Sequence, residues 1–163
     1  MAELTVNGRP YSVCRDLGAA RGGRSWLVTD GEEFYVLKEM DPDRPERLAA
    51  ERRVYERLAS LDVPMPRLLE TDETRRRLLK EYLPGPTAAE LAEGGAMRAE
   101  YVDQAEELCR RLAEAGVSID FFPESFVLSR GRLYYTEYEW TLFTPERSFP
   151  RAWAAYWTVS PLP

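Results

Sequence analysis

The stretch EFYVLKEMDPDRPERLAAERRVYERLASL, residues 33–61, decides the fold. Its first part, FYVLK, is a short apolar run that follows the turn signal TDGEE, so it predicts a strand entered through a hairpin. DPDRP breaks this pattern, and Pro45 suits the first turn of a helix. We expect that helix over about residues 45–61. The stretch therefore predicts a strand that leads directly into a helix.

Two charged residues in this stretch occupy positions that need a partner. The apolar residues of the helix form one stripe: Leu48, Val54, Tyr55, Leu58 and Leu61. Glu51 falls in the middle of that stripe, where burying an unpaired carboxylate would cost several kcal/mol. Lys38, at the end of the preceding strand, is the natural partner, and an arginine is the alternative. Lys38 itself is either an edge lysine that reaches solvent or a lysine directed at phosphate oxygens.

The remaining residues up to position 83 are typical of a small antiparallel sheet. YSVCRDL, RSWLVTD and EFYVLKEM predict three strands, and PRLLETDETRRRLLKEYL predicts two more joined by a polar turn. About five strands and one helix would then form a domain over residues 1–83. The glycine-bearing segment between the first two strands could approach a phosphate or could simply make a flexible hairpin.

The composition changes at Pro84-Gly85-Pro86, which we interpret as a hinge to a second domain over residues 84–163. TAAEL begins a short helix, with Thr87 and Glu90 spaced as a capping box. A strongly amphipathic helix is predicted over about 97–115, and Gly116 is a natural stop. The segment SIDFFPESFVLSRGRLYYTEYEW, residues 118–140, follows, and an aromatic, proline-rich tail completes the chain.

Composition excludes several classes of function. The net charge of −6 argues against a nucleic-acid binder, and no apolar run approaches the roughly 18 residues of a membrane helix. The polar N-terminus predicts a cytoplasmic protein. The absence of histidine excludes Ser-His and Cys-His nucleophiles. Among 22 basic residues only Lys38 and Lys80 are lysines, as expected if position 38 needs a slender ammonium.

These parts, in this order, resemble the protein-kinase-like fold over roughly residues 10–140. LGAARGGRSWLV aligns with the glycine-rich loop, with Gly18 and Gly23 matching its first and third glycines and Ala20 replacing the second. The resemblance implies an α+β, bilobed protein-kinase-like fold. It has an antiparallel N-terminal sheet with one helix and a reduced, mainly helical C-terminal lobe.

The resemblance also assigns roles in the first domain. Lys38 matches the strand lysine that holds the α- and β-phosphates of ATP, and Glu51 matches the helix glutamate that pairs with it. KEYLPGPTAAEL matches the hinge, with Glu81, Tyr82 and Leu83 where backbone would contact adenine. The implied nucleotide is ATP.

The segment SIDFFPES matches the catalytic loop. Asp120 stands where the acid faces the acceptor hydroxyl, and Glu137 stands where an acid holds Mg²⁺ on the phosphates. Ser125 replaces the metal-binding asparagine, and Glu139 could supply a further carboxylate. Ser118 replaces a histidine that organises the loop. These departures indicate either a variant metal site or a degenerate one.

The leading hypothesis is a minimal bacterial-type kinase-like protein that binds ATP with Mg²⁺ and transfers phosphate to a protein or small-molecule hydroxyl. The alternative is a pseudokinase, a binding or regulatory module without phosphotransfer, and a third is an unrelated α+β domain. The tail aromatics Trp140, Trp153, Tyr156 and Trp157 are expected to cap the small lower lobe. An exposed patch there would instead leave dimerisation through the tail open.

Overall fold

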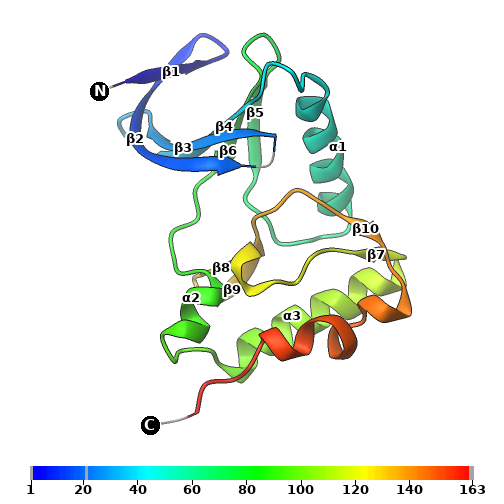
Figure 1. Cartoon of the computed structure of the whole chain (residues 1–163). Coiled ribbons are helices and arrows are strands. Elements are labelled where there is room, and N and C mark those ends of the chain that lie inside the picture. Colours follow the sequence, from blue (N-terminus) through cyan, green and yellow to red (C-terminus); the bar gives the residue numbers. More distant parts are fainter. Residues whose placement is uncertain (1, 21, 162–163) are drawn as a thin grey trace. The chain divides into compact units, whose positions relative to one another are not determined.

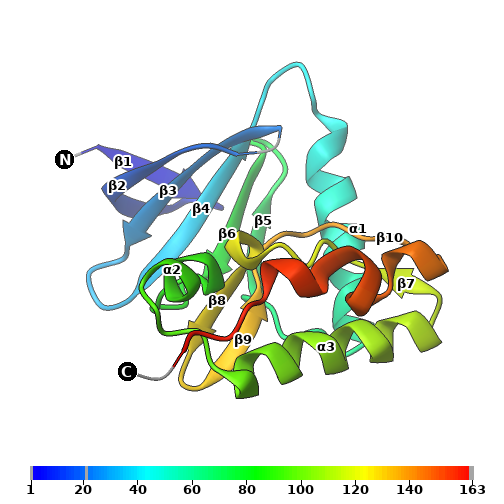
Figure 2. The same ribbon diagram turned by 60° about the horizontal axis from the view of Figure 1, so that its bottom comes forward.

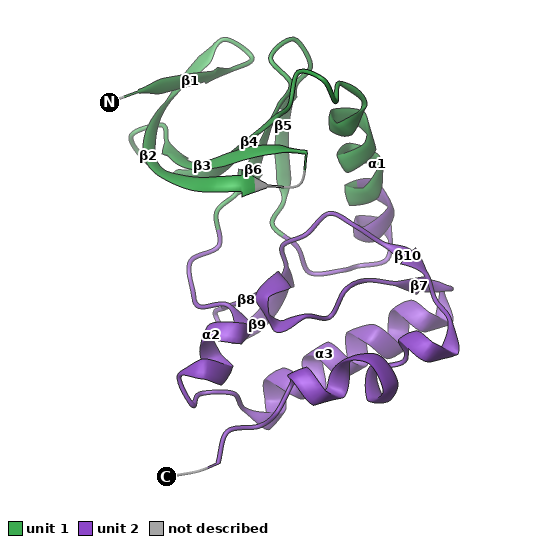
Figure 3. Ribbon diagram, viewed as in Figure 1, with its two compact units in different colours: residues 1–55, 66–82 green, residues 56–65, 83–163 purple. Residues whose placement is uncertain are grey.

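A computed structural model describes residues 2–20 and 22–161 of the chain. The chain forms two compact units, which Figure 3 distinguishes by colour. The first comprises residues 1–55 and 66–82, and the second comprises residues 56–65 and 83–163. The last change of unit follows Tyr82, one residue before the division expected at 83/84, and residues 56–65 group with the second unit.

Within the described residues the first unit contains a six-stranded antiparallel sheet that curls on itself (Figure 1). Its strands are β1 (Glu3–Val6), β2 (Arg9–Ala20), β3 (Gly23–Thr29), β4 (Phe34–Met40), β5 (Leu68–Asp72) and β6 (Arg77–Glu81). They follow the spatial order β1-β2-β3-β4-β6-β5. The strand beyond the expected five is β1, which turns into β2 through Asn7 and Gly8, both at positive φ. That turn geometry matches the twist of a two-residue hairpin.

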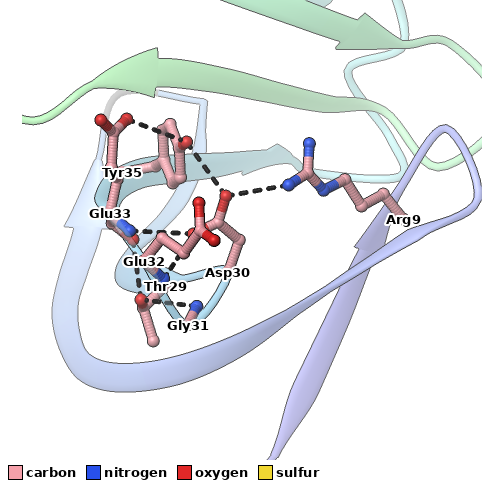
Figure 4. Close-up of polar contacts among 7 residues, drawn as sticks. All are labelled: Arg9, Thr29, Asp30, Gly31, Glu32, Glu33 and Tyr35. Carbon is pink, nitrogen blue, oxygen red and sulfur yellow. Dashed lines mark hydrogen bonds and ion pairs between the residues drawn. The ribbon is translucent and has the colours of Figure 1, made fainter.

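The hairpin predicted from TDGEE is confirmed between β3 and β4 (Figure 4). Oδ1 of Asp30 accepts hydrogen bonds from the backbone N–H groups of Glu32 and Glu33, each at 2.9 Å. Its Oδ2 accepts from Arg9 Nη2 at 2.9 Å and from the Tyr35 hydroxyl at 3.2 Å. The Glu33 and Glu32 backbone N–H groups are the main reason that the pKa of Asp30 lies below its ordinary value. One carboxylate thus fixes the turn and ties it to β2.

The two faces of the sheet bury different partners. One face forms an apolar cluster that contains Leu37 and Leu79: Val6, Tyr11, Val28, Leu37 and Leu79. The opposite face packs against α1 (Glu46–Ser60) through Met40, Leu48 and Leu78. The predicted helix over 45–61 is confirmed as α1. Side chains alternate between the two faces along a strand. Leu37 therefore faces the apolar cluster, and its neighbour Lys38 faces α1.

The helices of the second unit agree with the sequence pattern. The predicted capping box is confirmed in α2 (Ala88–Glu93), where the Glu90 N–H donates to Thr87 Oγ1 at 3.0 Å. The amphipathic helix expected over 97–115 is α3 (Ala99–Glu114), and its buried face is continuous: Ala105, Leu108, Cys109 and Leu112. Gly116 follows it with φ +74°, as a helix stop requires.

The segment 118–140, which carries the proposed catalytic loop, is built from short strands and turns. Strand β7 (Val117–Ser118) pairs with β10 (Thr141–Leu142), and a 3₁₀ turn (Pro123–Ser125) leads into the hairpin of β8 (Phe126–Ser129) and β9 (Arg132–Tyr135). Figure 2 shows α3 alongside the C-terminal turns of this unit. No helix among the described residues is long and apolar enough to cross a membrane.

The aromatic tail forms much of the core of the second unit. Trp153 and Trp157 are 5% and 2% exposed, and Trp157 Nε1 donates to the Phe121 carbonyl at 2.6 Å. The expectation that tail aromatics cap the second unit is therefore confirmed for these two residues, whereas Trp140 and Tyr156 are exposed. The tail forms a π-helical turn (Phe149–Trp153) followed by a 3₁₀ turn (Ala154–Tyr156).

Candidate active site

Lys38 and Glu51 form a buried ion pair in the first unit. The Nζ atom of Lys38 on β4 donates to Oε1 of Glu51 on α1. Lys38 is 6% exposed and Glu51 is 5% exposed, so Lys38 is not an edge lysine that reaches solvent. The carboxylate predicted in the apolar stripe of the helix thus has the predicted partner.

Glu51 is also close to two further cations. Lys80 Nζ on β6 lies 3.8 Å from Glu51 Oε2, and Arg47 Nη2 lies 3.9 Å from Glu51 Oε1. Within the described residues Oε2 is buried and accepts no hydrogen bond. Lys80 was missed from the sequence, although the scarcity of lysine was a signal. The β4–β6 register, with Lys38 opposite Leu78 and Val36 opposite Lys80, brings both lysines to one face.

The glycine-bearing segment is the end of the β2–β3 hairpin. Gly18 has φ +88° and lies at an irregularity in the β2–β3 register, and its N–H donates to Asp16 Oδ1 at 2.7 Å. Gly23 packs so closely on β4 that a Cβ there would collide with the Glu39 carbonyl. Both glycines therefore have a local structural reason, and their contact with phosphate stays a prediction. Arg21 and the side chain of Ala20, within the same proposed loop, lie outside the described residues.

Hydrogen bonds and close backbone packing fix residues of the proposed hinge. The Glu81 carboxylate accepts a hydrogen bond from the Arg67 N–H at 3.1 Å, and the Glu81 N–H donates to the Arg67 carbonyl at 2.8 Å. Leu83, the first hinge residue in the second unit, is half-buried. Gly85 has φ +139°, and a Cβ there would collide with the Leu128 carbonyl. The contact of Glu81 and Leu83 with adenine stays a prediction.

Asp120 is held by an arginine of the tail. Arg147 Nη2 donates to Asp120 Oδ1 at 2.9 Å, and Arg147 Nε donates to Ser118 Oγ at 2.9 Å. Ser118 is almost fully buried, whereas the Asp120 side chain is 45% exposed. Arg147 belongs to no motif in the sequence, and no periodic signal could have indicated it.

The two acid-bearing segments of the second unit are joined through Tyr135. Its hydroxyl donates to the Glu139 carbonyl at 3.1 Å and accepts from the Asp120 N–H. Burial raises the pKa of Tyr135, and the nearby carboxylates of Glu137, Asp120 and Glu139 raise it further. Three of the predicted site residues therefore surround one buried tyrosine.

Ser125 is joined to the same region. Its carbonyl accepts hydrogen bonds from the N–H and the hydroxyl of Thr136, at 2.9 Å and 3.0 Å. Ser125 is buried, Glu137 is exposed, and Glu139 is half-buried. In the described part of the chain, no group of three or more histidine, cysteine, aspartate or glutamate side chains is arranged to hold a metal ion. The roles of Ser125, Glu137 and Glu139 as metal ligands stay predictions.

The curled antiparallel sheet, the strand lysine paired with a helix glutamate, and the acid-bearing loop with its following hairpin define a reduced protein-kinase-like fold. The model of the phosphotransferase enzyme family matches residues 13–156, and the chain belongs to that family. No curated protein matches the chain. Membership in the protein-kinase-like superfamily and the α+β fold class expected from the sequence are thereby confirmed.

Proposed function

We propose that this protein is an ATP-dependent phosphotransferase that transfers the γ-phosphoryl group to a hydroxyl of a small molecule or protein. The observation that carries the proposal is the buried ion pair between Lys38 and Glu51. Burying two charges costs several kcal/mol per ion, so such a pair is weak evidence for a purely stabilising role. In a chain of the phosphotransferase family, a lysine held by a carboxylate supports a role in binding phosphate.

Lys38 is proposed to bind the α- and β-phosphate oxygens of ATP, and Glu51 to hold its ammonium in place. The contacts of Glu51 with Lys80 and Arg47 support this assignment. When Lys38 binds phosphate, Glu51 retains two other cations and is not left as a buried, unpaired carboxylate. Gly18, Gly23, Glu81 and Leu83 are the further residues proposed to contact the nucleotide.

Asp120 is proposed to accept the proton of the acceptor hydroxyl. As that oxygen bonds to the γ-phosphorus, the bond from phosphorus to the β–γ bridging oxygen breaks, and ADP leaves with the electron pair. The products are a phosphate ester, ADP and one proton, which Asp120 passes to solvent. The 45% exposure of the Asp120 side chain supports this role, because its carboxylate is accessible from outside.

The donor chemistry of the second unit is suited to Mg²⁺. In phosphoryl-transfer sites this ion is bound through one or two carboxylates together with phosphate oxygens and water, so a group of three protein carboxylates is not needed. Glu137 would hold it, with Ser125 or Glu139. When bound, the ion would neutralise charge on the β- and γ-phosphates.

Nucleotide binding is tested by thermal shift with ATP, ADP and Mg²⁺ at millimolar concentrations. We expect the melting temperature to rise with ATP and less so in the Lys38→Met variant, because a ligand that binds the native state stabilises it. No rise with any nucleotide would refute the binding step.

Catalysis is tested with Asp120→Asn, which we expect to abolish phosphoryl transfer. Glu124→Gln is the matched control, because Glu124 is an exposed acid in the same loop. Undiminished transfer by the Asp120 variant would refute the assignment.

A second candidate function is nucleotide binding without phosphotransfer. The ion pair of Arg147 with Asp120 supports it, because one oxygen of the carboxylate is already engaged by a cation. Ser118 and Ser125, which stand where the kinase-like pattern has a histidine and a metal-binding asparagine, also favour this candidate. Stabilisation by ATP with no turnover of any acceptor would favour this candidate.

A further inference from the structure

Arg147 joins the two polar residues at the start of the proposed catalytic loop. Its guanidinium donates through Nε to Ser118 Oγ and through Nη2 to Asp120 Oδ1, with both contacts at 2.9 Å. We infer that Arg147 is the positioning residue of Asp120, and that Arg147 and Ser118 together perform the loop-organising role of the histidine that Ser118 replaces. This inference rests on the proposed function of Asp120 as the base.

The guanidinium is well suited to fix the distance between these two residues. It is planar, its N–H groups have a fixed geometry, and it stays charged at all relevant pH values. Ser118 is a stable reference point, because it is 1% exposed and its strand β7 pairs with β10. A side chain that bonds to both Ser118 and Asp120 therefore sets the position of the Asp120 carboxylate relative to a buried, paired strand.

Arg147 is itself held in place by its surroundings. Its guanidinium carbon lies 5.5 Å from the ring centre of Trp153, within the range of a cation–π contact. Its backbone N–H donates to the Thr144 carbonyl at 2.9 Å, and its own carbonyl accepts from Cys109 Sγ at 3.8 Å. The Arg147 side chain is 28% exposed. The cation is thus pre-organised before any substrate binds, which lowers the entropic cost of holding Asp120.

The geometry distinguishes positioning from blockage. Arg147 donates to Oδ1 of Asp120, while the Asp120 side chain stays 45% exposed. The backbone of Asp120 has a second contact, because its N–H donates to the Tyr135 hydroxyl. Arg147 and Tyr135 therefore hold the same residue, and the exposed part of the carboxylate remains accessible to the acceptor hydroxyl.

The kinetic test compares Arg147→Met with Arg151→Met, a matched exposed arginine four residues along the tail. If Arg147 positions Asp120, Arg147→Met should lower kcat about 100-fold, the cost of roughly 1 Å of misplacement. The Kd for ATP should stay within about twofold, and Arg151→Met should match wild type. Unchanged or increased kcat in Arg147→Met would overturn the inference, and an increase would show that Arg147 blocks the base.

Chemical rescue separates positioning from general loss of structure. We expect millimolar methylguanidinium to restore at least about tenfold of the lost kcat in Arg147→Ala, because the added cation can occupy the vacated position beside Ser118 and Asp120. It should have no effect on Asp120→Asn. Lost activity in both Arg147 variants without any rescue would assign Arg147 a structural role and overturn the inference.

A readout independent of turnover separates this inference from the proposed function. Absence of phosphoryl transfer by the wild-type protein would refute the proposed function and leave the positioning of Asp120 to be decided by hydrogen exchange. We expect the Asp120 N–H to exchange about tenfold faster in Arg147→Met and unchanged in Arg151→Met, since loosening the side chain opens the loop locally. Equal exchange in the two variants would overturn the role of Arg147 whatever the turnover.

Discussion

Replacing Lys38 and replacing Glu51, the two partners of the buried ion pair, should destabilise the protein by different amounts. Lys38→Met leaves Glu51 with Lys80 at 3.8 Å and Arg47 at 3.9 Å. Glu51→Gln instead leaves both lysines and Arg47 close together without a countercharge. The structure therefore predicts that loss of the carboxylate destabilises the protein more than loss of the lysine does.

The size of this difference follows from the contacts. Breaking a buried ion pair by removing one partner costs about 3–5 kcal/mol, and we expect a value in this range for Glu51→Gln. Two charges near 4 Å apart attract by about 4 kcal/mol at an effective dielectric constant of 20, so the remaining cations should offset much of the loss in Lys38→Met. We therefore expect about 1–2 kcal/mol for Lys38→Met.

The free energy of unfolding is measured for both variants by guanidinium denaturation followed by circular dichroism. Lys80→Met serves as the companion variant, and Lys38→Met combined with Lys80→Met should cost more than the sum of the single changes. A free-energy loss in Lys38→Met equal to or above that in Glu51→Gln would refute the three-cation description of the site.

Three further predictions concern the supporting structure. The pKa of Asp30 is depressed in the folded state, so the stability that this carboxylate contributes is present above the ordinary aspartate pKa of 3.8 and is lost as the pH falls through the folded pKa. Acid titration of Asp30→Asn should therefore show a shallower loss of stability below about pH 4 than the wild-type protein. Gly23→Ala should lower the free energy of unfolding by about 1–3 kcal/mol, because its Cβ would collide with the Glu39 carbonyl, and an unchanged denaturation midpoint would contradict that packing. Trp157→Ala should lower the free energy of unfolding by about 3–5 kcal/mol, and Trp140→Ala, at an exposed residue, by less than about 1 kcal/mol. Similar losses in thermal unfolding of the two variants would be evidence that the tail is not part of the core.

The sequence was most informative where a charge interrupted an apolar pattern. Glu51 could be predicted to need a cation, because its place in the stripe of α1 is fixed by helix periodicity. The predicted helices α1 and α3 and the hairpin β3–β4 are confirmed. Each has a strong local signal in the sequence: apolar periodicity for the helices and the turn residues TDGEE for the hairpin. Strand β1 was missed because it is four residues long and follows the N-terminus directly.

Partnerships that depend on tertiary structure could not be predicted. Lys80 reaches Glu51 only because of the register between β4 and β6, which the sequence of either strand leaves open. Arg147 reaches Asp120 through the course of an irregular tail that has no periodic pattern. The glycines illustrate the opposite difficulty: Gly23 matches a functional motif and also has a packing reason of its own.

The most direct test of the central claim is to follow ATP by ³¹P nuclear magnetic resonance in the presence of Mg²⁺ and a panel of hydroxyl-bearing acceptors. We predict that the wild-type protein and Glu124→Gln produce ADP together with a new phosphate-ester resonance, and that Lys38→Met and Asp120→Asn do not. An ester resonance of undiminished intensity from Asp120→Asn, or no ester and no ADP from the wild-type protein with any acceptor, would contradict the account.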